Sequence, residues 1–161
     1  MTNPIRPTDN QARALAHKLL SQAGFAALAV VSDTGTPLVT RIAFGLSSVG
    51  QPISLVSSLS AHTQILKTNP KCSLLVGEPG PKGDPLTHPR LSLTGAVRFL
   101  QHGAPGYREM AAHYLHGHPK AKLYIDFTDF AFACFDIDAG YLNGGFGKAF
   151  HLTPVDMGFC G

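Results

Sequence analysis

Short apolar runs separated by turn residues fill most of this 161-residue chain. Each run has the length of a β-strand, and the breaks between runs contain glycine, as in Asp33-Thr34-Gly35 and at Gly50. Strands at hairpin spacing pair antiparallel with their neighbours, and a small barrel removes their exposed edges. The pattern therefore predicts a six-stranded antiparallel barrel, with strands at residues 25–31, 38–44, 53–56, 71–76, from 90 onward and about 130–137.

The segment that begins at Arg90 has the clearest strand pattern. Its apolar positions alternate with polar ones, which is the period of a strand with one buried face. The face expected to point into the core carries Leu91, Leu93, Gly95, Val97 and Phe99.

Two other segments repeat their apolar residues with helical spacing. The first follows Thr8-Asp9-Asn10-Gln11, which has the spacing of a capping box, and it ends at Gly24. The second runs from Tyr107 to Leu115 and is closed by Gly117. We therefore expect one mainly-β domain with helices, made of an N-terminal helical segment (1–24), a barrel core (25–150) and a C-terminal tail (151–161).

The composition bears on partners and compartment. Only 14% of the residues are charged and 44% are hydrophobic, which predicts further burial in a subunit interface. The net charge of +3 is spread along the chain without basic runs, so a nucleic-acid partner is not expected. No stretch approaches the ~20 apolar residues of a membrane span, and no segment has the pattern of a signal peptide. We expect a cytoplasmic protein without a membrane partner.

The three cysteines, Cys72, Cys134 and Cys160, form no CxxC pair. Two of them lie in apolar runs, where a thiol behaves as a small hydrophobic group. All three are expected to be free and structural.

The segment Ser57-Ser58-Leu59-Ser60-Ala61-His62-Thr63 joins a predicted strand to a short helix that Asn69-Pro70 ends. The first turn of a helix has unpaired N–H groups and a partial positive charge, so a phosphate could bind there. Four hydroxyl groups in the segment are additional donors. The alternative is that these residues only cap the helix, with Ser60 at the N-cap.

Arg41 lies near the middle of an otherwise apolar strand. A guanidinium is costly to bury without an anionic partner, and its planar fork matches phosphate oxygens. If its strand neighbours the one that ends at Ser57, both residues reach the same phosphate. The alternative places Arg41 beside an internal carboxylate or in water.

Five motifs follow one another in a characteristic order: TRIAF, SSLSAHT, TNPKCSLLV, DPLTHPRLSLTGAV and DFAFACFDIDAGYLNGGFGKA. This succession resembles the pyridoxamine 5′-phosphate oxidase-like superfamily of FMN-binding split barrels over about residues 25–150. More narrowly, it is similar to the branch that contains haem-degrading proteins of the HugZ type.

The resemblance implies a homodimer with FMN at the subunit interface. The phosphate would be held by Arg41, Ser57, Ser58, Ser60, His62 and Thr63. The haem-degrading branch also has GGFG followed by a basic residue, usually arginine and here Lys148, which joins the cofactor-binding candidates.

The chain departs from its relatives in two places. Ala61-His62 stands where pyridoxamine phosphate oxidases carry an Arg-Lys pair, and the basic C-terminal substrate segment is missing, so pyridoxamine oxidation is not expected. The C-terminal loop that supplies an iron-binding histidine in the haem-degrading branch has no visible counterpart after His151.

The resulting hypothesis is an FMN-dependent oxidoreductase acting on a small-molecule substrate, in which the flavin does the redox chemistry. The sequence shows no nucleophile with its base, so no catalytic residue is assigned. The alternatives are a haem-binding or haem-degrading protein of the HugZ type and an FMN-binding module without turnover. No metal site is expected from His113, His116 and His118, which fit the polar face of a helix.

Overall fold

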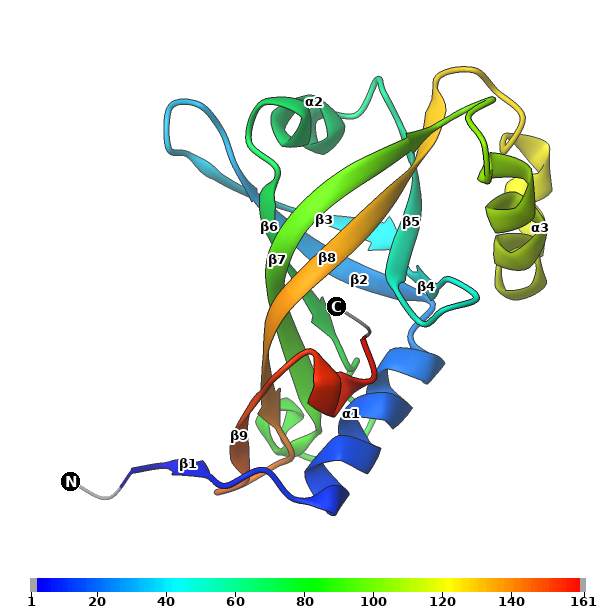
Figure 1. Ribbon diagram of the computed structural model, residues 1–161. Coiled ribbons are helices and arrows are strands. Elements are labelled where there is room, and N and C mark those ends of the chain that lie inside the picture. Colours follow the sequence, from blue (N-terminus) through cyan, green and yellow to red (C-terminus); the bar gives the residue numbers. More distant parts are fainter. Residues whose placement is uncertain (1–2, 160–161) are drawn as a thin grey trace.

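The computed structural model describes residues 3–159. The fold is mainly β: a sheet forms the body of the molecule, and helices α1, α2 and α3 lie around it (Figure 1). The helices are α1 (Asn10–Gln22), α2 (Ala61–Thr68) and α3 (Tyr107–Gly117), with short 3-10 turns η1 (Pro85–Thr87), η2 (Pro119–Leu123) and η3 (Val155–Met157). The strands are β1 (Ile5–Arg6), β2 (Phe25–Val31), β3 (Pro37–Ala43), β4 (Gly45–Leu46), β5 (Pro52–Ser57), β6 (Lys71–Val76), β7 (Arg90–Gln101), β8 (Phe130–Asn143) and β9 (Ala149–Leu152).

The described strands form a mixed, open sheet of nine strands. The six expected strands are present as β2, β3, β5, β6, β7 and β8 and pair antiparallel, but the expected count of six is not confirmed. The main path runs β1-β9-β8-β7-β6-β2-β3, while β5 pairs with β8 and β4 with β5. The pairing of β1 with β9 is parallel. The additional strands β1, β4 and β9 have two to four residues each, too few to show an alternating pattern in sequence.

Strands β7 and β8 are the long, curved centre of the sheet (Figure 1). Their register shifts between Thr94 and Gly95, where Asp138 is the extra residue of a β-bulge in β8. A Cβ atom on Gly95 would overlap the carbonyl oxygen of Asp136 on β8, so only glycine fits at this bulge. The predicted strand at 130–137 continues to Asn143, because its polar second half still pairs with β7 and β9.

Two apolar cores lie on opposite faces of β5 and β8. The larger core fills the barrel interior and includes Leu28, Val56 and Phe135. The smaller core packs α3 and the turn after it against Ile53 and Phe132. Both faces of β5 and of the first part of β8 are therefore buried, which explains why β8 begins with an unbroken apolar run and why the interior of β5 is apolar except for the buried Ser54.

The helices lie in the predicted segments, but some of their ends differ from the expected ones. Helix α1 is capped by Asp9, whose carboxylate accepts the Ala12 N–H at 2.8 Å, and not by Thr8 as the capping-box spacing predicts. The Thr8 hydroxyl instead donates to the carbonyl of His151 at 3.2 Å and fastens the N-terminal segment to β9. Helix α3 ends at Gly117 as expected.

Cys72 and Cys134 are buried free thiols, as predicted. Burial raises the pKa of Cys72 to about 12, so this thiol stays protonated and unreactive. Cys160 lies outside the described residues. Across residues 3–159, no helix combines the length and the apolar character that a bilayer crossing requires.

Candidate functional site

The turn between β5 and α2 carries most of the predicted phosphate ligands. Ser60 is the N-cap residue of α2, as expected, but its side chain makes no capping hydrogen bond. Its carbonyl oxygen accepts the N–H groups of Thr63 and Gln64 at 3.0 and 3.1 Å. The Ser60 hydroxyl is therefore not used by the helix itself.

Ser57 is engaged by a residue that the sequence reasoning missed. Its hydroxyl donates to Oδ2 of Asp129 at 2.7 Å and accepts the N–H of Leu59 at 3.1 Å. The N–H of Ser58 donates to the Asp129 carbonyl at 2.7 Å. A carboxylate thus stands beside the proposed phosphate position. Nothing local in the sequence links residues 57 and 129, because β5 and β8 pair across a long stretch of chain.

Thr63 and His62 occupy the first turn of α2. Thr63 is 2% exposed, and its buried hydroxyl oxygen has no hydrogen-bond partner among residues 3–159. Such an unpaired group is uncommon in a folded protein and is consistent with a missing partner. His62 is half-buried, and burial lowers its pKa, so its ring is neutral at neutral pH.

Arg41 lies on β3, directly opposite Ala27 of β2. Its side chain is exposed, and its guanidinium carbon is 5.2 Å from the centre of the Phe25 ring. It takes part in neither of the salt bridges found within residues 3–159, so the internal carboxylate considered as an alternative is not its partner there. Strand β3 is in contact with β5.

Within one chain, Lys148 lies far from the other candidate ligand-binding residues. It sits in the turn between β8 and β9, next to Asn143, whereas Ser57 pairs with Phe130 at the other end of β8. These strand ends are separated by 14 residues of β8, roughly 40 Å. Lys148 could therefore share a ligand with Ser57 only if it came from a second subunit.

Arg41 belongs to an apolar surface, here called the outer sheet face. Paired positions put Phe25, Ala27 and Ala29 of β2 beside Val39 of β3 and Leu75 of β6, all pointing away from the barrel interior. Val39 is 65% exposed, Leu75 42% and Phe25 40%. An exposed apolar patch on a sheet is typical of an interaction site.

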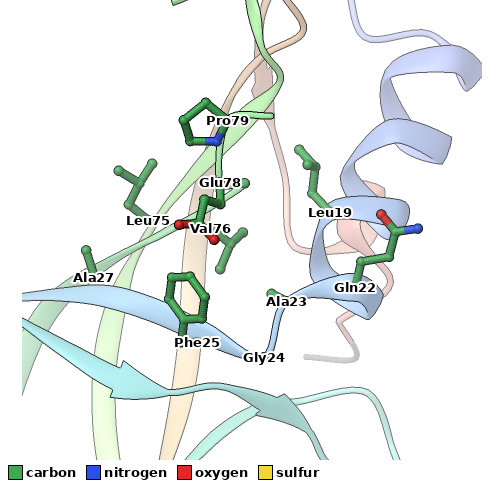
Figure 2. Close-up of a pocket in the computed structure, with 11 residues that line it drawn as sticks. Leu19, Gln22, Ala23, Gly24, Phe25, Ala27, Leu75, Val76, Glu78 and Pro79 are labelled. Carbon is green, nitrogen blue, oxygen red and sulfur yellow. The ribbon is translucent and has the colours of Figure 1, made fainter. Parts of the chain in front are cut away.

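A cavity of about 390 Å³ opens at one edge of this face. It lies between the end of α1, the start of β2 and the end of β6 (Figure 2). Leu19, Phe25 and Leu75 supply apolar walls, and the carboxylate of Glu78 lies among them (Figure 2). This cavity could not be predicted from the sequence, because it is formed by three separate segments.

The histidines of α3 line a second cavity of about 450 Å³, beside the end of α1. His113 and His118 hydrogen-bond through Nε2 to the carbonyls of Leu46 and Gly24, at 2.9 and 3.2 Å. No group of three or more potential metal ligands occurs between residues 3 and 159. The observed bonds indicate that these two histidines fasten α3 to the barrel.

Comparison with known proteins identifies relatives of this chain. The chain is 40% identical over 101 residues to the chloroplastic "Non-canonical heme oxygenase HOZ" of Arabidopsis thaliana, a match that covers 61% of this chain and only 29% of that protein. It is 25% identical to a solved structure of a haem-binding protein from Mycobacterium smegmatis, with a TM-score of 0.81, covering 96% of this chain and 61% of the other.

A more distant solved structure is similar in fold alone. It is a Clostridium acetobutylicum protein of the pyridoxinephosphate oxidase family, related to general stress protein 26. The identity is 16% and the TM-score 0.68, with 93% of this chain and 99% of the other covered. The family model described as "CREG, beta-barrel" matches residues 7–157. The chain therefore belongs to the CREG β-barrel family.

Proposed function

We propose that this protein binds haem, and that it does so as a homodimer with the ligand beside the outer sheet face. The observation that carries the proposal is the pairing of Ser57 with the Asp129 carboxylate at 2.7 Å. That carboxylate would repel the dianionic phosphate of FMN, which the sequence favoured as the ligand. The haem-binding relative and the haem oxygenase named above support the same choice.

The residues present fit haem. Its flat apolar ring needs a broad apolar surface, which Phe25, Val39 and Leu75 offer. Its propionates need a cation, and the Arg41 guanidinium is exposed on the same face. When bound, haem would supply the iron and redox chemistry, while the chain would position and shield it.

Two histidines are the candidate iron ligands. His62 is half-buried with a lowered pKa, so one ring nitrogen keeps the lone pair that a metal requires. His151 is exposed on β9 and stacks on Tyr141, with ring centres 4.8 Å apart. Neither ring forms a hydrogen bond with another described residue, unlike the rings of His113 and His118.

The same face supports the proposed homodimer, with the ligand enclosed where the two copies meet. Three large apolar side chains around the small residues Ala27 and Ala29 make a flat surface, and a two-fold axis brings such a surface against its own copy. The low charge of the chain supports this arrangement. An ordinary specific interface would bury about 1,200–2,000 Å² there.

The test is titration of the apoprotein with haemin and, separately, with FMN. We expect a stoichiometric Soret band with haemin and its loss or shift in His62→Ala or His151→Ala. His116→Ala, an exposed histidine on α3, is the matched control and should leave the band unchanged. Stoichiometric FMN binding together with no saturable Soret band would contradict the proposal.

FMN remains the second candidate because of Thr63. Its buried, unpaired hydroxyl lies in the first turn of α2, beside the unused Ser60 side chain, where a phosphate would find donors. In that case the protein would be an FMN-dependent oxidoreductase or a flavin-binding module. Flavin fluorescence released on denaturation, and bleaching of bound flavin by NAD(P)H, would distinguish these two roles.

A further inference from the structure

The loop from Gly77 to Pro89 joins β6 to β7 and forms one wall of the cavity in Figure 2. Its two ends are held close together, because Val76 pairs with Leu91. Gly77 has a φ of +99°, and a Cβ atom there would lie 2.7 Å from the Pro89 carbonyl oxygen. The neck of the loop is therefore fixed, and only glycine fits at position 77.

The second half of this loop is held in place by several hydrogen bonds. Asp84 accepts the N–H of Leu86 on its side chain at 2.9 Å, and its carbonyl accepts the Thr87 hydroxyl at 2.7 Å. Arg90, at the start of β7, donates to the carbonyl of Leu86 at 3.0 Å. These bonds do not depend on a group that titrates near neutral pH.

The first half of the loop is held by a different set of hydrogen bonds. Residues Gly80–Gly83, here called the flap, form only two hydrogen bonds with other described residues, and both go to the ring of His88. The N–H of Gly80 donates to Nδ1 at 3.2 Å, and Nε2 lies 2.8 Å from the carbonyl oxygen of Lys82. The imidazole fills the space beside both glycines of the flap.

These two bonds require one protonation state of the ring. Nδ1 must have a free lone pair to accept an N–H, and Nε2 must then carry the proton that it donates to the Lys82 carbonyl. The neutral ring with its proton on Nε2 satisfies both partners. A second proton would go to Nδ1, turn the acceptor into a donor, and set it against the Gly80 N–H.

We propose that His88 is a pH-sensitive latch, which holds the flap in place next to the cavity-lining residues Gly77, Glu78 and Pro79 when its ring is neutral and releases it when the ring is protonated. Histidine takes up its second proton in about the pH range 5–8. Release would free Pro79 and the flap to move away from the cavity while Asp84 and Arg90 keep the rest of the loop in place.

The charged groups around His88 do not take over its role of holding the flap. Within the loop they are Glu78, Lys82 and Asp84, Arg90 comes from β7, and α1 contributes the apolar Leu19 at the neck. The Arg90 guanidinium is directed to backbone carbonyls, including that of His88 at 3.4 Å. His88 forms no salt bridge with any residue between 3 and 159, so no fixed carboxylate there stabilises the protonated ring.

The experiment measures exchange of the Gly80 amide by NMR on the full chain at pH 8 and pH 5, corrected for the intrinsic rate. We expect protection at pH 8 and a loss of about tenfold at pH 5, the worth of one ordinary hydrogen bond. His88→Phe should remove protection at both pH values. Thr87→Val, which removes another side-chain bond of the same loop, should keep the pH dependence.

Amides of β7 report whether the fold is intact, and they should stay protected in every sample. Equal Gly80 protection at the two pH values in the unmodified protein would overturn the proposal. So would a pH dependence that persists in His88→Phe. If that variant fails to fold, ring ¹⁵N shifts of the unmodified protein decide: a proton on Nδ1 at pH 8 contradicts the latch.

Discussion

The Ser57 hydroxyl and the Asp129 carboxylate lie 2.7 Å apart, where the end of β5 meets the start of β8. This hydrogen bond joins two segments that come from distant parts of the chain. It also puts a negative charge beside the first turn of α2, whose free N–H groups would otherwise attract an anion. The charge at Asp129 therefore influences which ligand this end of the barrel accepts.

Replacing Asp129 by Asn tests that influence. The amide oxygen can still accept the Ser57 hydroxyl, but the charge is gone. We expect FMN affinity to rise about tenfold, and stability to fall by about 1 kcal/mol as a charge-assisted bond becomes neutral. Fluorescence titration and urea unfolding measure the two effects. Asp126→Asn, in the preceding exposed loop, is the control, and weaker FMN binding in Asp129→Asn would refute the repulsion.

Gly95→Ala tests the close approach of β7 to the bulge in β8. The added methyl group would overlap the carbonyl oxygen of Asp136, which belongs to the sheet backbone and cannot move aside cheaply. We expect a loss of more than about 2 kcal/mol in urea unfolding. Gly24→Ala is the matched control, because a Cβ there meets no atom within 4 Å. Equal stabilities of the two variants would show that the bulge is tolerant.

Most of the strands and helices could be predicted because each has a local pattern. The runs at β2 and the first part of β8 are apolar over their whole length, and α3 shows its helical spacing directly. The second half of β8 could not be recognised, because Asp136 and Asp138 interrupt the apolar run. Its strand conformation comes from pairing with β7 and β9.

The candidate site was predicted only where its residues are neighbours in sequence. The segment from Ser57 to Thr63 does form a strand-to-helix turn, with Ser60 at the N-cap. Asp129 and the Arg41–Phe25 contact depend on which strands pair, and a single sequence does not give strand pairing. The assignment of these residues to a ligand remains a prediction.

Asp156 should make stability depend on pH in the acid range. Its pKa is lowered, first by the Thr153 backbone N–H, which donates to it at 2.9 Å, and then by Arg13, whose Nε lies 2.7 Å away. A carboxyl group with a lowered pKa in the folded state stabilises the protein above the unfolded value of about 4. That stabilisation is lost as the pH falls through the folded value.

Urea unfolding between pH 6 and pH 2 measures this effect. Asp156→Asn should lose roughly 0.5–1 kcal/mol at pH 6, the scale of a partly solvated ion pair, and show a shallower decline in acid. Asp33→Asn, in the exposed turn after β2, is the control and should follow the unmodified protein. A decline as steep in Asp156→Asn as in the unmodified protein would exclude Asp156 as its source.

Arg41 should contribute to ligand affinity more than to stability. Its one aromatic contact, 5.2 Å from the Phe25 ring centre, is exposed and worth about 0.5–1 kcal/mol. A hydrogen bond from its guanidinium to an anionic ligand group would be worth about 1.5–3 kcal/mol. Arg41→Ala should therefore weaken binding of haemin, or of FMN, by ten- to hundredfold, roughly 1.4–2.8 kcal/mol. The unfolding midpoint should change little. Arg41→Lys keeps the charge but not the fork, so it should restore only part of the affinity. Unchanged affinity for both ligands in Arg41→Ala would remove Arg41 from the site and with it the link between the outer sheet face and ligand binding.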